Sequence, residues 1–162
     1  MSSCLMALLA AIALSTFLFT ADPKGDLAIT DVKLATGRDR RYTYKSQEYA
    51  SVTFNVSADL TPLFNWNTKQ LFLYLEAEYE NAKGGKNDVV IWDRIVRRKE
   101  DAHINVVGRN KYAFKDIANS FKKVPAAHYA LKYNVMPYVG ALTYGEAART
   151  LEPLEFSATQ SQ

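Results

Sequence analysis

The most constraining feature of the sequence is a run of alternating residue types between positions 71 and 80. One face of this run is apolar and consists of Leu71, Leu73, Leu75, Ala77 and Tyr79. The other face changes from aromatic to acidic and consists of Phe72, Tyr74, Glu76, Glu78 and Glu80. Successive side chains of a β-strand point to opposite faces, so a period of two residues predicts a strand with one buried face.

Similar alternation recurs along the chain at fairly even spacing. We expect further strands at residues 26–35, 48–60, 89–96, 103–107, 111–114 and 128–135, with weaker candidates at 141–144 and 151–156. Residues 115–121 fit either a loop or one helical turn. A polar segment with Gly84 and Gly85 predicts a hairpin between two of the strands. Many short strands without a long helical period favour a mainly β fold, an antiparallel β-sandwich.

An apolar, uncharged run of 18 residues extends from Cys4 to Ala21. As a helix it would be about 27 Å long, close to the hydrocarbon thickness of a bilayer. Two interpretations fit this run, a retained transmembrane helix and a cleaved secretory signal. Cleavage after Ala21 or Thr20 would place bulky Phe19 or Leu18 where a small residue is favoured, so we expect a retained signal-anchor. Residues 1–3 carry no basic side chain, so the positive-inside rule says little about its orientation.

Composition limits the classes of protein that fit. The 162 residues carry 20 basic and 17 acidic side chains, a net charge of +3, which gives no strong field for capturing nucleic acid. Cys4 is the only cysteine, so the remainder of the chain must fold without an internal disulfide. We expect a transmembrane segment at 4–21, one domain at 22–157 and a flexible tail at 158–162.

The sequence carries no recognisable catalytic or metal-binding pattern. The two histidines, His103 and His128, lie in strand-like runs, and no Gly-x-Ser-x-Gly motif is present. The spacing of histidine and cysteine matches no zinc site. The acidic side chains at 76, 78 and 80 could bind a hard cation, but a solvated acidic edge that opposes aggregation is the more ordinary role. We therefore expect no catalytic residues, no metal and no cofactor.

Three separated motifs carry a resemblance to a known family. They are FNWNTKQLFLYLEAEY at 64–79, VVIWDRI at 89–95 and YNVMPYVG at 133–140. In this order they resemble the lumenal domain of the third subunit of the eukaryotic signal peptidase complex, and the resemblance covers residues 27–154. It implies a lumenal β-sandwich on a single-pass anchor in the endoplasmic reticulum membrane. It also implies a non-catalytic accessory subunit whose partners are the catalytic subunit, the other small membrane subunits and, through residues 4–21, the lipid bilayer.

A folded domain without catalytic apparatus acts by binding. The candidate interface consists of Phe64, Asn65, Trp66, Asn67, Lys69, Gln70, Trp92 and Asp93. Tryptophan offers a large apolar area with one N–H donor, and asparagine and glutamine can bridge to a partner's backbone. The alternative is that Phe64 and Trp66 cap the core while the asparagines bond to nearby backbone. Trp92 is opposite Ile91 in the alternation, so it could pack in another layer or face a partner.

One modification and one other function remain open. Asn55-Val56-Ser57 is an acceptor for N-linked sugar if the domain enters the secretory lumen, although a position within a strand is harder to modify than a loop. The alternative function is a secreted or membrane-anchored β-sandwich that binds carbohydrate or another ligand. Its aromatic contacts would come from Trp66, Tyr74 and Tyr79.

Overall fold

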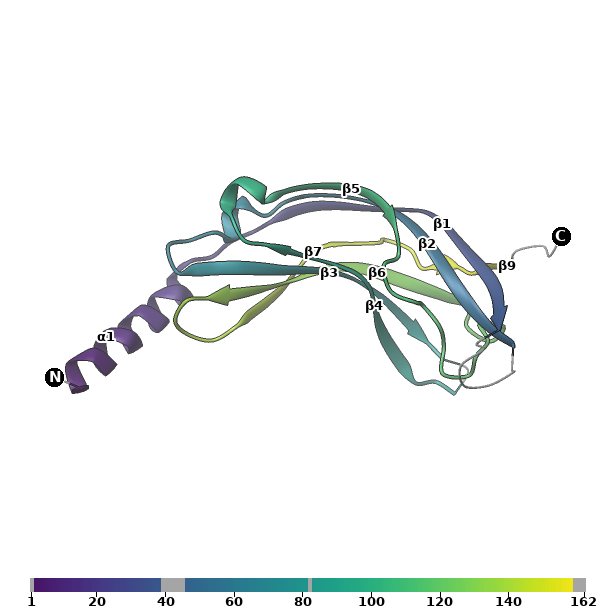
Figure 1. Ribbon diagram of the computed structural model, residues 1–162, viewed down its shortest axis with the longest axis horizontal. Coiled ribbons are helices and arrows are strands. Elements are labelled where there is room, and N and C mark those ends of the chain that lie inside the picture. Colours follow the sequence, from purple (N-terminus) through teal and green to yellow (C-terminus); the bar gives the residue numbers. More distant parts are fainter. Residues whose placement is uncertain (1, 39–45, 82, 159–162) are drawn as a thin grey trace.

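The computed structural model describes residues 2–38, 46–81 and 83–158, and these residues form one N-terminal helix followed by two β-sheets (Figure 1). The helical elements are α1 (Ser2–Ser15) and three 3₁₀ turns, η1 (Thr16–Leu18), η2 (Thr61–Leu63) and η3 (Lys99–Asp101). The strands are β1 (Lys24–Arg38), β2 (Ser46–Asp59), β3 (Thr68–Glu80), β4 (Lys86–Val96), β5 (His103–Arg109), β6 (Ala126–Pro137), β7 (Thr143–Arg149), β8 (Leu154–Glu155) and β9 (Ser157–Ala158).

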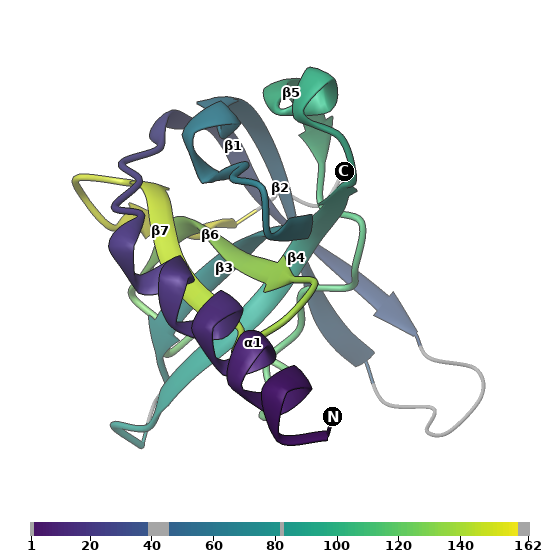
Figure 2. The ribbon, with the colours of Figure 1, turned by 90° about the vertical axis from the view of Figure 1, so that its left-hand side faces the viewer.

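The two sheets differ in strand order. One sheet has the order β5-β2-β1-β9, and the other has the order β4-β3-β6-β7 with β8 also paired to β6. All the pairs are antiparallel except β1 with β9. Figures 1 and 2 show β1, β2 and β5 on one side of the domain and β3, β4 and β6 on the other, with α1 projecting from one end. The prediction of a mainly β fold with antiparallel sheets is confirmed.

The apolar faces of the central strands meet in one hydrophobic core. Leu71, Leu73 and Leu75 of β3 are fully buried, and so are Val52 and Phe54 of β2. All five belong to the same cluster of buried residues, which draws on both sheets. The period-two pattern of each strand therefore explains how the core is assembled, because every second side chain leaves water on folding.

A β-bulge in β4 settles the position of Trp92. Leu75 of β3 pairs with Trp92, whereas the next residue, Glu76, pairs with Val90, so Ile91 is an extra residue in the ladder. The bulge turns both Ile91 and Trp92 toward the core. Ile91 is fully buried, and the Trp92 ring packs edge-on against Phe54 with 5.6 Å between ring centroids. Trp92 thus lies against the core rather than on the outer face.

The segment after β5 differs from the prediction. The expected strand at 111–114 is absent from the structure, in which Phe114 makes only an isolated bridge to Ala50. The Asn110 side chain explains the break, because its Nδ2 donates to the carbonyl oxygens of Tyr112 (2.8 Å) and Ala50 (3.4 Å) and so forms a turn. Residues 115–121, for which a loop and a helical turn were both open, form a loop with turns.

The N-terminal helix is shorter than predicted. α1 ends at Ser15 and a 3₁₀ turn ends at Leu18, after which Phe19 has an extended backbone (φ −94°, ψ 105°). Ser15 Oγ donates to the Ile12 carbonyl oxygen at 2.7 Å, and Thr16 Oγ1 donates to that of Ala13. Such side-chain bonds compete with the helical ladder. Among the described residues, no helix has both the length and the apolar character needed to span a bilayer.

The C-terminal strands are short. β7 begins two residues inside the weak candidate at 141–144 and continues to Arg149. β9 pairs Ala158 with Leu34 of β1, one residue beyond the expected domain boundary. Residues 159–162 of the expected tail lie outside the described residues.

Candidate functional site

The turn between η2 and β3 is held by its own polar side chains. The Asn67 amide N–H donates to Asn65 Oδ1 at 2.8 Å, and the Asn65 amide N–H donates to Thr68 Oγ1 at 3.2 Å. Thr68 Oγ1 in turn donates to the Leu63 carbonyl oxygen at 2.9 Å. This is the local backbone bonding that was the alternative to an interface role for the asparagines.

Asn67 also joins this turn to the β6–β7 loop. Its side chain donates from Nδ2 to the Val139 carbonyl oxygen at 2.7 Å and accepts at Oδ1 from the Val139 amide at 3.1 Å. Its carbonyl oxygen accepts from the Tyr138 amide at 2.8 Å. Asn67 is only 1% exposed, so these bonds replace water completely. The structure thus brings together two of the motifs on which the family resemblance depends.

The remaining residues of the predicted interface divide by exposure. Trp66 is 58% exposed, and Lys69 is also exposed. Phe64 packs against the core, and Gln70 Nε2 donates to Met136 Sδ at 3.1 Å. The interface role of all these residues stays a prediction. Trp66 and Lys69 are the two in this turn that offer a largely exposed side chain.

Asp93 fastens the segment after β5 to β4. Its Oδ1 accepts from Lys111 Nζ and from the Tyr112 hydroxyl, each at 2.7 Å. The amides of the same two residues donate to the Ile91 carbonyl oxygen at 2.7 and 3.1 Å. The bond from Lys111, followed by that from Tyr112, lowers the pKa of Asp93 below its usual value. This carboxylate therefore has a structural role within the chain.

The outer face of the five-stranded sheet carries a network of charges, which we call the charged network. It consists of Glu76 and Glu78 of β3, Lys132 of β6, and Glu146 and Arg149 of β7. Lys132 Nζ lies 2.9 Å from Glu76 Oε2 and 2.6 Å from Glu78 Oε1. Arg149 bonds both oxygens of Glu78, at 2.7 and 3.0 Å, and both oxygens of Glu146.

The charged network corrects the expectation of a solvated acidic edge. β3 is an inner strand between β4 and β6, and the side chains of Glu76 and Glu78 are only 12% and 23% exposed. Their negative charge is matched by Lys132 of the neighbouring strand β6 and by Arg149 of β7, the next strand in the sheet. The ion pairs of these carboxylates with Lys132 and Arg149 were not predicted from the sequence. Lys132 could have been found from the alternation along β6, which puts it on the face opposite Tyr133.

The charged network makes stability depend on pH. Hydrogen bonds from Arg149, together with those from Lys132 and against the effect of burial, lower the pKa of Glu78 from 4.5 to about 2. A lowered folded-state pKa adds stability that is present above pH 4.5 and is lost as the pH falls from 4.5 to about 2.

We expect Glu78→Gln to lower the free energy of unfolding by about 1–2 kcal/mol at pH 7, after allowance for solvent screening. The variant should also lose less stability as the pH falls from 4.5 to about 2. Urea unfolding at several pH values measures it. The exposed Glu152→Gln is the control, and an unchanged pH profile in Glu78→Gln would contradict the assignment.

Partly exposed apolar side chains lie beside the charged network on the same face, and we call them the aromatic row. They are Ile95 of β4, Phe72 and Tyr74 of β3, and Tyr144 of β7. The rings of Phe72 and Tyr74 stack with 5.5 Å between centroids. Asn134 pairs with Phe72 and Tyr144 across the sheet, and its buried Oδ1 has no hydrogen-bond partner among the described residues. This face therefore combines apolar area with an acceptor that a partner could satisfy.

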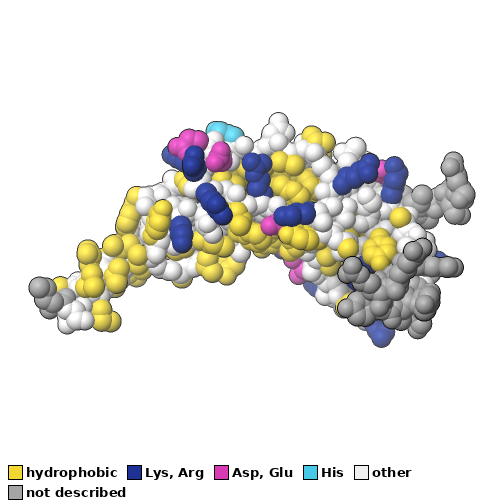
Figure 3. All heavy atoms as spheres, in the orientation of Figure 1, with side chains coloured by type: hydrophobic (Ala, Val, Ile, Leu, Met, Phe, Trp, Pro, Cys, Tyr) yellow, Lys and Arg dark blue, Asp and Glu magenta, His cyan; other side chains and the backbone are white. Residues whose placement is uncertain are grey.

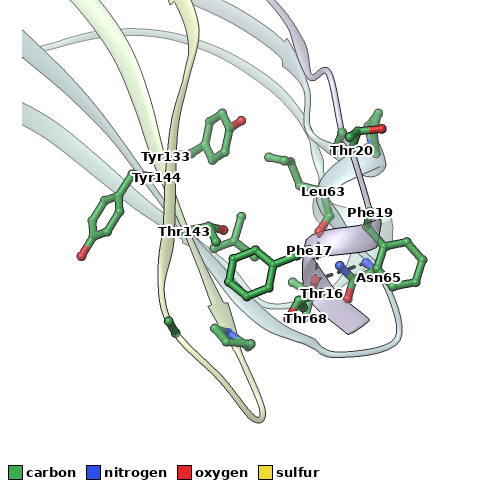
Figure 4. A pocket seen from close by; sticks show the side chains of 15 residues that line it. Thr16, Phe17, Phe19, Thr20, Leu63, Asn65, Thr68, Tyr133, Thr143 and Tyr144 are labelled. Atoms are coloured by element: carbon green, nitrogen blue, oxygen red, sulfur yellow. Dashed lines mark hydrogen bonds between the residues drawn. The ribbon is translucent and has the colours of Figure 1, made fainter. Parts of the chain in front are cut away.

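A pocket of about 370 Å³ lies where the N-terminal segment meets the five-stranded sheet (Figure 4). Phe17 and Phe19 approach it from the N-terminal side, and Tyr133 and Thr143 line it from the sheet. Its lining residues are all apolar, hydroxyl-bearing or amide side chains, with no carboxylate, amine or imidazole. The pocket is suited to apolar contact rather than to proton transfer.

The two histidines do not share a site. His103 begins β5, where its Nδ1 lies 3.5 Å from Asp59 Oδ1, whereas His128 lies on β6 of the other sheet and pairs with Glu78. In the described part of the chain, no cluster of three or more His, Cys, Asp or Glu side chains is arranged to hold a metal ion.

The aromatic residues of the carbohydrate-binding alternative do not form a common surface. Tyr79 is 6% exposed, and its hydroxyl donates to Asp116 Oδ1 at 2.8 Å inside the domain. Tyr74 stacks on Phe72 on the outer face of the sheet, and Trp66 lies in the turn before β3. No observation on these three residues favours that function.

These observations define the class of protein, a mainly β domain with antiparallel sheets that follows an apolar N-terminal helix and presents candidate binding surfaces. A family model described as signal peptidase subunit matches residues 1–159. Signal peptidase complex subunit 3 of Caenorhabditis briggsae is 38% identical over 146 residues, which cover 90% of this chain and 81% of that protein. The Gallus gallus protein of the same name is 34% identical over 142 residues, which cover 85% of this chain and 79% of that protein. The Saccharomyces cerevisiae protein of this name is 45% identical over 103 residues, which cover 63% of this chain and 56% of that protein. The chain belongs to the signal peptidase subunit family.

Proposed function

We propose that this chain is a non-catalytic accessory subunit of the endoplasmic reticulum signal peptidase complex. It supports the catalytic subunit in removing signal peptides from nascent secretory proteins and supplies no reacting group of its own. The single observation that carries this function is the family match along residues 1–159. The structure adds that the polar side chains of Asn65, Asn67 and Asp93, three residues of the predicted interface, hold the domain's own turns and strands together.

The proposed arrangement is a lumenal β-sandwich at residues 22–157, attached to the membrane through the apolar segment 4–21. A single hydrophobic core that draws on both sheets supports the sandwich. The absence of charge between Cys4 and Ala21 supports contact of this segment with lipid. Attachment of two subunits to one membrane raises their effective concentration, so a modest lumenal interface is sufficient for assembly.

The proposed contact with the catalytic subunit is the outer face of the five-stranded sheet. Figure 1 shows the domain arched, with this sheet on the inner side of the arch. The aromatic row places Ile95, at 46% exposure, beside the stacked rings of Phe72 and Tyr74, which are held on β3, an inner strand of the sheet. Large side chains fixed on a rigid scaffold lose little entropy on binding, and they are the usual centres of binding energy in protein interfaces.

A matched pair of variants tests this contact. Ile95→Arg places a charge in the aromatic row, whereas Val107→Arg makes a similar change on β5 of the other sheet, where Val107 is 71% exposed. We expect Ile95→Arg to weaken co-purification of the peptidase subunits by roughly tenfold or more, because the charge loses water in the interface. Val107→Arg should leave co-purification unchanged. Equal recovery with both variants would exclude this face, and no recovery with the unaltered chain would exclude the function.

We also propose that Asn55 carries N-linked sugar. The residue is exposed on β2, and it pairs with Ala28 and Val107, whose side chains are also exposed and leave room around it. Expression in secretory cells should give a product that shifts after endoglycosidase treatment, and Asn55→Gln should abolish that shift. Asn105→Gln is the matched control, because Asn105 is exposed on neighbouring β5 but is not in an acceptor sequence. An unchanged shift in Asn55→Gln would exclude the site.

A further inference from the structure

The end of the domain next to α1 exposes apolar side chains on two loops, and we call this set the rim. The rim consists of Trp66, Tyr138 and Leu142, which are 58%, 68% and 47% exposed. Trp66 comes from the turn before β3, and the other two come from the β6–β7 loop. The bond from the Tyr138 amide to the Asn67 carbonyl oxygen, with the side-chain bonds of Asn67 to Val139, makes the two loops one unit.

The rim lies level with the end of α1. Gly140, at the tip of the β6–β7 loop, lies next to the helix: a Cβ on it would be in van der Waals contact with the Cα of Ala13 at 3.4 Å and would lie 3.8 Å from Thr16 Oγ1. Its φ of +119° also favours glycine at this position. Figures 1 and 2 show this loop beside the last turns of the helix. Tyr138 and Leu142 flank Gly140 by two residues on either side.

The helix itself identifies what covers this end of the molecule. α1 has no buried residue, and Leu5, Met6 and Leu8 are each more than half exposed. Figure 3 shows hydrophobic side chains along the visible face of this helix, which projects from the domain. A helix that is apolar on all sides requires an apolar surrounding, and an uncharged one is suited to lipid. Because the rim lies level with the carboxyl end of α1, a bilayer that surrounds the helix brings its polar interface to the rim.

We propose that the rim rests in the polar interface of a lipid bilayer and sets the orientation of the domain on the membrane. This proposal rests on the membrane attachment in the function proposed above. Tryptophan and tyrosine favour the interface, because their rings are apolar and their N–H or O–H groups remain hydrated. The two loops, residues 61–70 and 137–144, contain no carboxylate and one cation, Lys69, so they do not repel anionic headgroups.

Trp66 is a built-in probe for the proposed contact. The chain has only two tryptophans, and the other one, Trp92, is half-buried against the core, where its ring packs on Phe54. The full chain is reconstituted into phosphatidylcholine–phosphatidylserine vesicles in which part of the lipid carries bromine on its acyl chains near the headgroup. The difference in emission between the wild-type chain and Trp66→Phe isolates Trp66, since Trp92 is intact in both. We expect bromolipid to quench this difference signal and to leave the emission of Trp66→Phe nearly unchanged.

A second set of variants tests the role of the rim in orientation. The double change Tyr138→Ser and Leu142→Ser removes the other two contacts and should reduce the quenching of Trp66. The matched control is Ile117→Ser, an 88% exposed aliphatic position in the segment that packs beside Glu48 at the opposite end of β2. It should leave quenching unchanged. Circular dichroism confirms that each variant is folded.

The outcomes separate this inference from the function on which it rests. If the chain floats with vesicles in a density gradient but Trp66 is not quenched, the rim proposal is wrong and membrane attachment stands. If the chain does not float, both are wrong. A third outcome is that bromolipid does not quench Trp66 but that the assembled peptidase complex protects it from iodide. This outcome also overturns the proposal and assigns the rim to a protein contact.

Discussion

Replacing Phe114 by alanine should lower the free energy of unfolding by about 3–5 kcal/mol, the range for removing a large aromatic side chain from a packed core. Phe114 is fully buried and forms a β-bridge to Ala50 of β2. Its ring centroid lies 5.7 Å from that of Tyr79, 5.3 Å from that of Phe121 and 5.8 Å from that of Phe156. Tyr79 comes from β3, Phe121 from the segment between β5 and β6, and Phe156 from between β8 and β9. The cavity would therefore weaken the packing of several segments at once.

Urea unfolding of the detergent-solubilised chain, followed by tryptophan fluorescence, measures this loss. Ile117→Ala is the control, because Ile117 is 88% exposed three residues further along the same segment. It should change stability by less than about 0.5 kcal/mol. A loss below about 1 kcal/mol for Phe114→Ala would mean that this segment does not form part of the core.

The second large effect is expected for Asn67→Ala, at about 2–3 kcal/mol. The change removes both side-chain bonds to Val139 and leaves that residue's N–H and C=O without their partner in a region where Asn67 is 1% exposed. A buried polar group without a partner costs about 1–3 kcal/mol. The side chain is small and polar, so lost packing adds little.

The same unfolding experiment tests Asn67→Ala against Lys69→Ala, a change at an exposed position two residues away. We expect the second variant to unfold like the unaltered chain. Faster hydrogen exchange at the amides of Tyr138 and Val139 in Asn67→Ala would show that the β6–β7 loop has been released. Unchanged exchange and stability would contradict the role given to Asn67.

The elements that sequence alone predicts well are those in which one residue in two is buried. In β2 and β3 the apolar positions recur without interruption, so the alternation by itself assigns Phe54 and Leu73 to the core, where both are fully buried. β4 shows the limit of that reasoning. Strict alternation separates Ile91 from Trp92, but one extra residue in the ladder turns both inward, and no local residue type marks such a bulge.

Contacts between distant positions could not be predicted. The residue types around Asn67 predict a polar turn, but its partner Val139 is 72 residues away in the chain. Likewise, Glu78 binds Arg149 across 71 residues, so a face that is acidic within one strand becomes balanced only when the strands are paired. The helix end at Ser15 could not be predicted either. The Ser15 hydroxyl donates to a carbonyl oxygen of the preceding turn, but such a bond destabilises a helix only slightly, so the residue type does not by itself mark the end.

In the proposed function, this chain supports signal-peptide cleavage without performing it. The most direct measurement is cleavage of a secretory precursor by the affinity-purified complex that contains the tagged full chain, beside the same amount of the full chain purified alone. We expect the complex to release the signal peptide, immunodepletion of the tagged chain to remove this activity, and the chain alone to be inactive. Cleavage by the purified chain alone, or undiminished activity after its depletion, would show that the chain is not a non-catalytic supporting subunit.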